Sequence, residues 1–123
     1  MNWWMLAAGA MALICAAGHA VAGVRMFYRP IKAAIADELQ SGVLTGMWHL
    51  ITINFTLSAL VLVVLGASGR QDLAAWLVAA QFAGYAAVYL AISLRLGGIA
   101  KLFQWMPFAA TAILTAVGAH FAP

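Results

Sequence analysis

The chain has 123 residues, of which 67% are hydrophobic and only 7% are charged, and its formal net charge is +3. A soluble domain carries about 25% charged residues, so this composition excludes a soluble globular fold and predicts an integral membrane protein. The few positive charges lie at the ends of apolar runs, which argues against a nucleic-acid-binding surface.

Four apolar segments follow one another along the chain, at about residues 3–24, 43–67, 73–94 and 102–121. Each is about 20 residues or longer, enough for a helix to cross a hydrocarbon core of about 30 Å. The two later connections are short and glycine-rich, which favours consecutive helices as antiparallel neighbours. The sequence therefore predicts an all-α integral membrane protein: a single domain over 1–123, with four transmembrane helices in an antiparallel bundle.

The first segment is rich in small residues at helical spacing. Ala8, Ala12 and Ala16 recur every four positions, a pattern that lets helix backbones approach closely in lipid. No basic region precedes the segment, so we expect a retained span and not a signal peptide. Cys15 is the only cysteine, which excludes a disulfide within the chain. We expect it to be a small packing residue, with metal or redox chemistry as the alternative.

The long connection after the first segment predicts a short amphipathic helix in the membrane interface, over about 30–41. A proline at its start suits a first helical turn, and Ile31, Ile35 and Leu39 recur every four positions. Ser41-Gly42 is expected to end this helix. A solvated linker and a docking site for a charged partner are the alternatives.

The basic residues predict the orientation. The connections 25–42 and 95–101 hold Arg25, Arg29, Lys32, Arg95 and Lys101. The positive-inside rule places both connections in the cytoplasm and both termini outside. We expect a bacterial inner membrane with periplasmic termini, and a mitochondrial membrane is the alternative. The tryptophans lie near predicted span ends, as interfacial anchors do: Trp3, Trp4, Trp48, Trp76 and Trp105.

Polar side chains interrupt the second and third segments. Counted helically from His49, three threonines share its face, which predicts that this face points at other helices and not at lipid: Thr45, Thr52 and Thr56. Asn54 shares a face with Ser58, and Gln81 with Tyr85. Because an unsatisfied amide in lipid costs several kcal/mol, we expect hydrogen bonds between helices or a subunit interface at these positions.

His19 and His49 are the candidate cofactor ligands. His19 lies about one turn before the predicted end of the first span, and His49 about one turn after the predicted start of the second, so the two imidazoles are expected at similar depth. They could ligate haem b, hold another metal ion or transfer protons. The alternative is that each histidine makes a hydrogen bond across a helix interface.

Nothing in the sequence supports catalysis. The acidic residues Asp37, Glu38 and Asp72 all lie outside the predicted spans, and the chain has no phosphate loop, nucleotide fingerprint or CxxC motif. We therefore expect no enzymatic activity.

The order of several short motifs resembles a known family. Gln40-Ser41-Gly42 is followed, after five residues, by Trp48-His49-Leu50, and Ala17-Gly18-His19 ends the first span. Phe82-Ala83-Gly84-Tyr85 loosely matches a motif of the third span. Of a motif in the fourth span, only Pro107 and the pair Ala109-Ala110 match. This order is similar to a family of small four-span membrane proteins of unknown function that includes the transmembrane protein 256 group. The resemblance implies a four-helix membrane bundle with His19 and His49 at signature positions, and no known activity.

Three functions are consistent with the sequence. The first is a non-enzymatic integral membrane protein that acts as a homo-oligomer or as an accessory subunit among other membrane subunits. The second is a small homo-oligomeric transporter or channel, whose pathway would be lined by Thr45, His49, Thr52, Thr56 and Gln81. The third is a haem- or metal-binding membrane subunit that uses His19 and His49.

Overall fold

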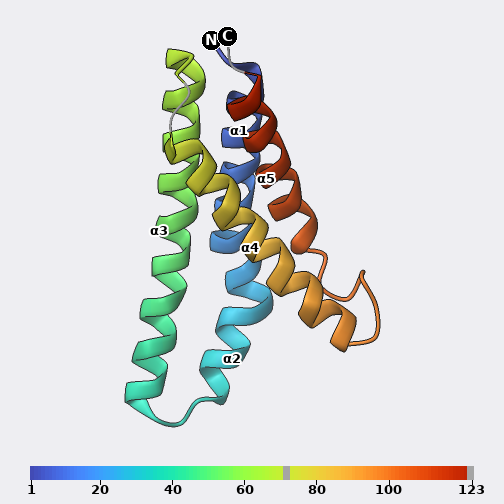
Figure 1. The fold of residues 1–123 in the computed structure, drawn as a ribbon. Coiled ribbons are helices and arrows are strands. Elements are labelled where there is room, and N and C mark those ends of the chain that lie inside the picture. Colours follow the sequence, from blue (N-terminus) through green and yellow to red (C-terminus); the bar gives the residue numbers. More distant parts are fainter. Residues whose placement is uncertain (71–72, 122–123) are drawn as a thin grey trace.

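The computed structural model describes residues 1–70 and 73–121, and these residues form helices and no strand. The elements are α1 (Trp3–Gly18), the π-helical segment η1 (His19–Tyr28), α2 (Arg29–Ala34), α3 (Glu38–Ser68), α4 (Leu73–Arg95) and α5 (Trp105–His120) (Figure 1). Three continuous helices are long and apolar enough to cross a membrane: Trp3–Ala34, Glu38–Ser68 and Leu73–Arg95. The predicted helical class and membrane-spanning helices are confirmed to this extent. Asp72 lies outside the described residues.

The first helix is longer than predicted. α1, η1 and α2 follow one another without a break from Trp3 to Ala34. The predicted span of 3–24 lies inside this longer helix, and no separate helix over 30–41 forms, because residues 35–37 are not helical and residues 38–41 belong to α3. The basic residues here end the apolar run but not the helix, because arginine and lysine are good helix formers. Pro30 is accommodated at the start of α2, directly after the π-helical stretch, and it has no N–H to donate.

α3 also begins earlier than predicted. The chain turns at residues 35–37, and Asp37 then caps α3, because its Oδ1 accepts the N–H of Gln40 at 2.8 Å. Ser41-Gly42, predicted to end a helix, lies inside α3. One glycine in a helix interior costs only about 1 kcal/mol, which a good cap offsets. α3 ends at Gly69, whose φ of 67° is the left-handed conformation that glycine adopts at helix ends.

The last helix is shorter than the predicted fourth segment. α5 has 16 residues, and residues 102–104 of that segment form turns. Pro107 lies in the first turn of α5, where its missing N–H costs no helical hydrogen bond, so it favours a helix start at this point. The turns at 96–104 are held by Ser93, whose hydroxyl donates to the Gly98 carbonyl at 2.7 Å and accepts the Leu102 N–H at 3.0 Å.

α1 packs against both α3 and α5, and α5 also packs against α4 (Figure 1). The backbones of α3 and α4, which are consecutive in sequence, approach each other at few places, and side chains make most of the contact between these two helices. Figure 1 shows α4 diverging from α3 towards the 96–104 connection.

Asn2 joins three helices where α1 begins. Its Oδ1 caps α1 by accepting the N–H groups of Trp4 and Met5, at 3.1 and 3.2 Å. Its Nδ2 donates to the Gly118 carbonyl of α5 at 2.7 Å, and its backbone N–H donates to the Gly66 carbonyl of α3 at 2.7 Å. Asn2 is only 4% exposed, so these bonds are shielded from water. This end of the molecule is tightly packed.

Aromatic rings fill the space where α3 and α4 diverge. Phe55 of α3, Phe82 and Tyr85 of α4 and Phe108 of α5 form one cluster, with ring centroids 5.4 to 6.0 Å apart. Such spacing suits edge-to-face and tilted ring packing. The rings connect α3 to α4 while holding their backbones apart.

Candidate functional site

A cavity of about 540 Å³ lies below the aromatic cluster, between the first helix, α3, α4 and the 96–104 connection. Its lining is almost entirely apolar, and aromatic side chains dominate it: Phe27, Trp48, Phe55, Tyr85, Tyr89, Phe103 and Phe108. A volume of about 300 to 1,000 Å³ with an apolar lining and few polar groups is usual for small-molecule sites. This cavity is the candidate functional site.

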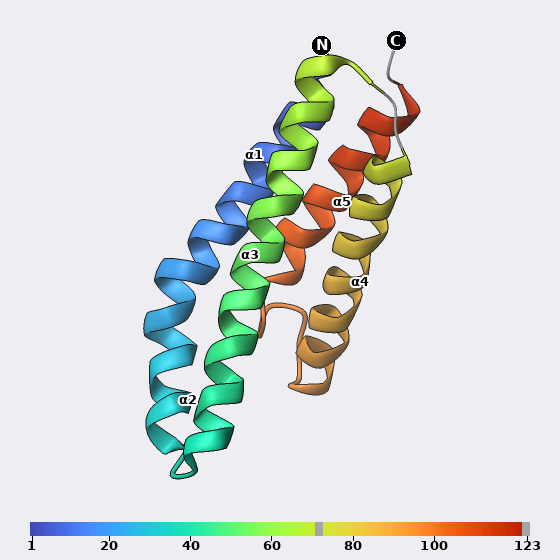
Figure 2. The same cartoon turned by 90° about the vertical axis from the view of Figure 1, so that its left-hand side faces the viewer.

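The cavity forms because two helices leave space beside the first helix. α5 begins only at Trp105, so the lower half of the first helix has no α5 alongside it (Figure 2). Gly18 and Gly23 line the cavity and add no side chain there, and a Cβ at Gly18 would meet nothing within 4 Å. The hollow is therefore a product of backbone placement and of small residues.

His19 lies in the cavity wall at the start of η1. Its ring stacks on the Trp48 indole with centroids 4.1 Å apart and planes 17° apart, and it meets the edge of Phe55 at 5.8 Å. Its Nε2 lies 3.2 Å from the Trp48 carbonyl oxygen. Because a carbonyl only accepts, Nε2 carries a proton here, which leaves Nδ1 of the neutral ring as an acceptor. π-helical turns are frequent at functional sites, and this one begins at the histidine.

Two polar atoms in the residues that line the cavity are buried without a hydrogen-bond partner. They are Nε1 of Trp48 and Oε1 of Gln104, for which the described part of the chain offers no partner. Gly23 makes room for the indole, because a Cβ there would lie 3.0 Å from the Trp48 ring. Buried polar groups in folded proteins are nearly always paired, and an unpaired one costs about 1 to 3 kcal/mol. A donor and an acceptor are thus left unpaired inside the protein, and both atoms have almost no accessible surface.

A polar cluster joins α3 to α4 on the other side of the aromatic rings. Asn54 donates from Nδ2 to the Tyr85 hydroxyl at 2.9 Å, and Gln81 donates from Nε2 to Asn54 Oδ1 at 2.9 Å and to Ser58 Oγ at 3.1 Å. The shared faces expected for Asn54 with Ser58 and for Gln81 with Tyr85 meet in these interhelical bonds. Asn54 itself is exposed on the surface of the single chain.

The predicted threonine stripe divides between half-buried and exposed positions. Thr45 donates to the Ser41 carbonyl at 2.8 Å and is bonded to the Tyr28 hydroxyl at 2.9 Å. Thr52 and Thr56 donate to carbonyls four residues back, at 3.2 and 2.9 Å. His49 and Thr56 are exposed. In a single chain, this part of the predicted face therefore does not contact another helix.

The structure does not bring the two candidate ligand histidines together. His19 lines the cavity, whereas His49 is exposed on α3 and outside the lining. Within residues 1–70 and 73–121, no hydrogen bond or ring contact joins them. Nor do the described residues contain a group of three or more His, Cys, Asp or Glu side chains that could hold a metal ion. One chain therefore offers no converged ligand pair for haem.

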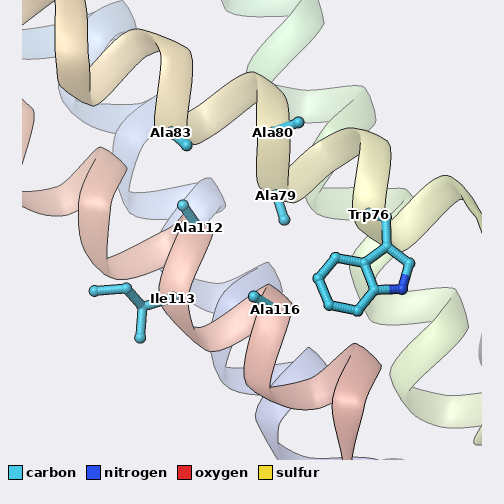
Figure 3. Close-up of a pocket in the computed structure, with 7 residues that line it drawn as sticks. All are labelled: Trp76, Ala79, Ala80, Ala83, Ala112, Ile113 and Ala116. Atoms are coloured by element: carbon cyan, nitrogen blue, oxygen red, sulfur yellow. The ribbon is translucent and has the colours of Figure 1, made fainter.

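A second, shallow hollow of about 380 Å³ lies between α4 and α5. Figure 3 shows Ala79 and Ala83 of α4 facing Ala112 and Ala116 of α5, with the Trp76 indole beside them. Alanines let these helices approach closely. The residues that line this hollow are alanines, one isoleucine and one tryptophan, and none of them is a candidate catalytic or metal-binding residue.

The sequence predicts Trp48 near the membrane interface, because it lies near the start of the apolar segment 43–67. α3 begins at Glu38, so Trp48 lies well inside the helix and stacks on His19. Trp48, Thr52 and Phe55 follow at spacings of four and three, which is the signal that could have placed them on one inner face. Gln104 precedes α5 in an irregular turn, where the sequence gives no periodic signal.

Comparisons of the chain with models of known protein families, with curated proteins and with solved structures find no match. The resemblance to small four-span proteins thus rests on motif order and spacing alone. The geometry of the chain is the basis for assigning a function.

Proposed function

We propose that the protein is a non-enzymatic integral membrane protein that works as a homo-oligomer, with the seam between α3 and α4 as its subunit interface. The observation that carries this proposal is the exposure of Asn54 near the middle of the apolar part of α3. A polar amide that faces lipid at this depth lacks hydrogen-bonding solvent, so such residues almost always face protein.

Within the polar cluster, one hydrogen-bond donor and one acceptor have no partner among the described residues. One N–H of Asn54 Nδ2 goes to Tyr85, and both N–H groups of Gln81 go to Asn54 and Ser58. The second N–H of Asn54 and the Oε1 of Gln81 have no partner within the described residues. The cluster thus keeps one donor and one acceptor.

A second copy of the chain supplies a partner for each of these two groups. In a twofold dimer the same patch meets itself, so the free Asn54 donor of each copy faces the free Gln81 acceptor of the other. Interhelical hydrogen bonds in membranes average about 0.6 kcal/mol each, which is modest but directional. A different membrane protein that offers an amide at this seam would make the chain an accessory subunit instead.

Asn54→Leu is expected to weaken self-association by about 1 kcal/mol, or roughly fivefold in the dimer dissociation constant, because both symmetric bonds are lost. Dilution of fluorescently labelled protein in lipid vesicles, followed by energy transfer, measures that constant. Thr56→Leu is the matched control: it also replaces an exposed polar residue of α3, but its hydroxyl is already bonded to the Thr52 carbonyl. Equal weakening by both variants, or monomers at every dilution of the unmodified protein, would contradict the proposal. Stoichiometric foreign chains after mild purification would favour an accessory subunit.

The proposed setting is a bacterial inner membrane that the chain crosses four times as an antiparallel bundle, with α5 as the fourth span and both termini periplasmic. The basic residues of the first helix and of the 95–101 region support this orientation. Alkaline phosphatase fused after His120 is therefore expected to be active, and fused after Lys101 inactive. The reverse pattern would place the termini in the cytoplasm, and activity at both positions would remove the fourth span.

A further inference from the structure

We propose that the cavity between the first helix, α3, α4 and the 96–104 connection holds an acyl chain of an anionic phospholipid, whose phosphate lies at the basic end of the first helix. This inference goes beyond the proposed function and is independent of the oligomeric state. It rests on an apolar lining that is open to lipid, on basic side chains from two segments beside it, and on the lack of ion pairs for those side chains within residues 1–70 and 73–121.

The cavity opens between the first helix and the 96–104 connection. Ile14 and Met26 of the first helix and Phe103 of the connection belong to its lining, yet they are 61%, 61% and 60% exposed. The opening therefore lies on the outer surface of apolar helices, which is the surface that a bilayer covers. A hydrocarbon chain enters from the bilayer at this point without leaving an apolar environment.

The lining suits a hydrocarbon chain along its whole length. It follows the first helix from Ile14 to Ile31, which is at most about 25 Å at 1.5 Å per residue. The hydrocarbon of one leaflet is about 15 Å deep, half of a core of about 30 Å. An acyl chain therefore fits within the cavity, and it needs no hydrogen-bond partner there.

One end of the cavity is basic. Arg25 and Arg29 lie on the first helix among residues that line the cavity, while Arg95 ends α4 and Lys101 lies in the 96–104 connection. All four basic side chains are exposed. In both views the connection lies level with the lower half of the first helix (Figures 1 and 2). Cations from two segments are thus placed at similar depth, on either side of the opening.

These four cations have no anionic partner in the part of the chain that the structure describes. None of them makes an ion pair there, whereas Lys32 donates a hydrogen bond to the Tyr28 hydroxyl at 3.2 Å. The described acidic residues Asp37 and Glu38 lie at the start of α3, where Asp37 caps the helix. A lipid phosphate is an anion of the right geometry, because a guanidinium group binds it through two parallel hydrogen bonds.

The occupant is assigned as an anionic lipid because charge and hydrocarbon meet at this place. A soluble anion would contact the basic side chains but would leave the cavity without an occupant. A zwitterionic lipid would fill the cavity, but its own cation would weaken the attraction to the arginines. An anionic phospholipid matches both features, and each basic residue near its phosphate is expected to strengthen binding about fivefold.

The test is native mass spectrometry of the protein in detergent with added dioleoylphosphatidylglycerol, in which each bound lipid gives a separate mass. We expect one tightly bound lipid per chain, with a dissociation constant at least about 25-fold lower than that of dioleoylphosphatidylcholine, which has the same chains. Glycerol 3-phosphate, which has the charge but no chains, is expected not to displace it. No bound lipid, equal binding of the two lipids, or displacement by glycerol 3-phosphate would overturn the proposal. Because no bilayer is present, the result does not depend on the orientation of the chain.

Gly18→Phe tests the position of the acyl chain. A new Cβ at Gly18 meets no atom within 4 Å, so the ring fills the cavity and should weaken binding of phosphatidylglycerol by at least about tenfold. Gly46→Phe adds the same ring at an equally open position outside the lining, and binding should be unchanged. Ala22→Leu, a smaller addition to the lining, should weaken binding about threefold and decides if Gly18→Phe does not fold. Unchanged binding in these two cavity variants would refute the assignment of the chain.

Arg25→Gln combined with Arg29→Gln tests the position of the phosphate. This double variant should weaken binding of phosphatidylglycerol about 25-fold, two factors of about five, and should leave binding of phosphatidylcholine within about twofold. Arg70→Gln is the matched control, because it removes an exposed charge beyond the opposite end of α3 and should change neither value. A general loss of structure would weaken both lipids alike. An unchanged ratio between the two lipids in the double variant would contradict the proposed phosphate site.

Discussion

Phe82→Ala is expected to destabilise the protein by about 3 kcal/mol, the low end of what this change costs in packed cores. Phe82 is fully buried, and its ring contacts those of Phe55, Tyr85 and Phe108 on three helices. Lipid is as apolar as the protein interior, so little transfer free energy is lost. The cost comes from the cavity that the smaller side chain leaves and from the lost ring contacts between α3, α4 and α5. Unfolding in mixed micelles with increasing SDS measures it.

Leu77→Ala is the control for this experiment. Leu77 lies on the same helix but is 63% exposed, so its truncation should change the free energy of unfolding by less than about 0.5 kcal/mol. Phe82→Leu, which keeps most of the volume, should fall between the two. Similar losses for Phe82→Ala and Leu77→Ala would mean that the aromatic cluster contributes no special packing.

Asn2→Ala is expected to cost about 2 kcal/mol, in two parts. Loss of the α1 cap accounts for about 1 kcal/mol. Loss of the donor to the Gly118 carbonyl accounts for about another, because it removes a buried hydrogen bond between α1 and α5. The temperature of unfolding in detergent reports the sum.

Asn2→Ser separates the two parts. Serine caps helices about as well as asparagine, but its short hydroxyl cannot cap α1 and also reach α5. We expect about half the loss seen with alanine. A serine variant as unstable as the alanine variant would show that the bond to Gly118 carries the whole effect, and an unchanged alanine variant would show that neither bond stabilises the protein.

The sequence predicts the helices of this protein better than their ends. Long apolar runs are visible without any structure, and the first three of the four predicted segments lie inside helices able to cross a membrane. Arg25 and Arg29 mark the end of hydrophobicity, but a helix ends only where backbone hydrogen bonding stops, and here that is Ala34. At the fourth segment the difference is reversed, because α5 begins inside the apolar run, at Trp105, with Pro107 in its first turn.

The polar cluster between α3 and α4 is predictable in part, but the candidate site is not. The spacing of Asn54 and Ser58, and of Gln81 and Tyr85, placed each pair on one helix face, and the cluster between α3 and α4 uses those faces. The cavity was not predictable, because it depends on how far α4 diverges from α3 and on where α5 starts. Those are properties of three-dimensional packing, which no single segment encodes.

The contact between Asn2 and Gly118 has a consequence for how the chain is made. α1 and α3 can pair as soon as the residues up to Ser68 have left the ribosome, but the side chain of Asn2 must wait for an acceptor 116 positions further along the chain. At about 5 to 20 residues per second, the interval between the emergence of Gly66 and that of Gly118 is roughly 3 to 10 s. During this interval the paired helices have an open flank in the bilayer. Arrival of α5 closes it, so the packing of α1 against α3 and α5 is completed only after Gly118 has been made.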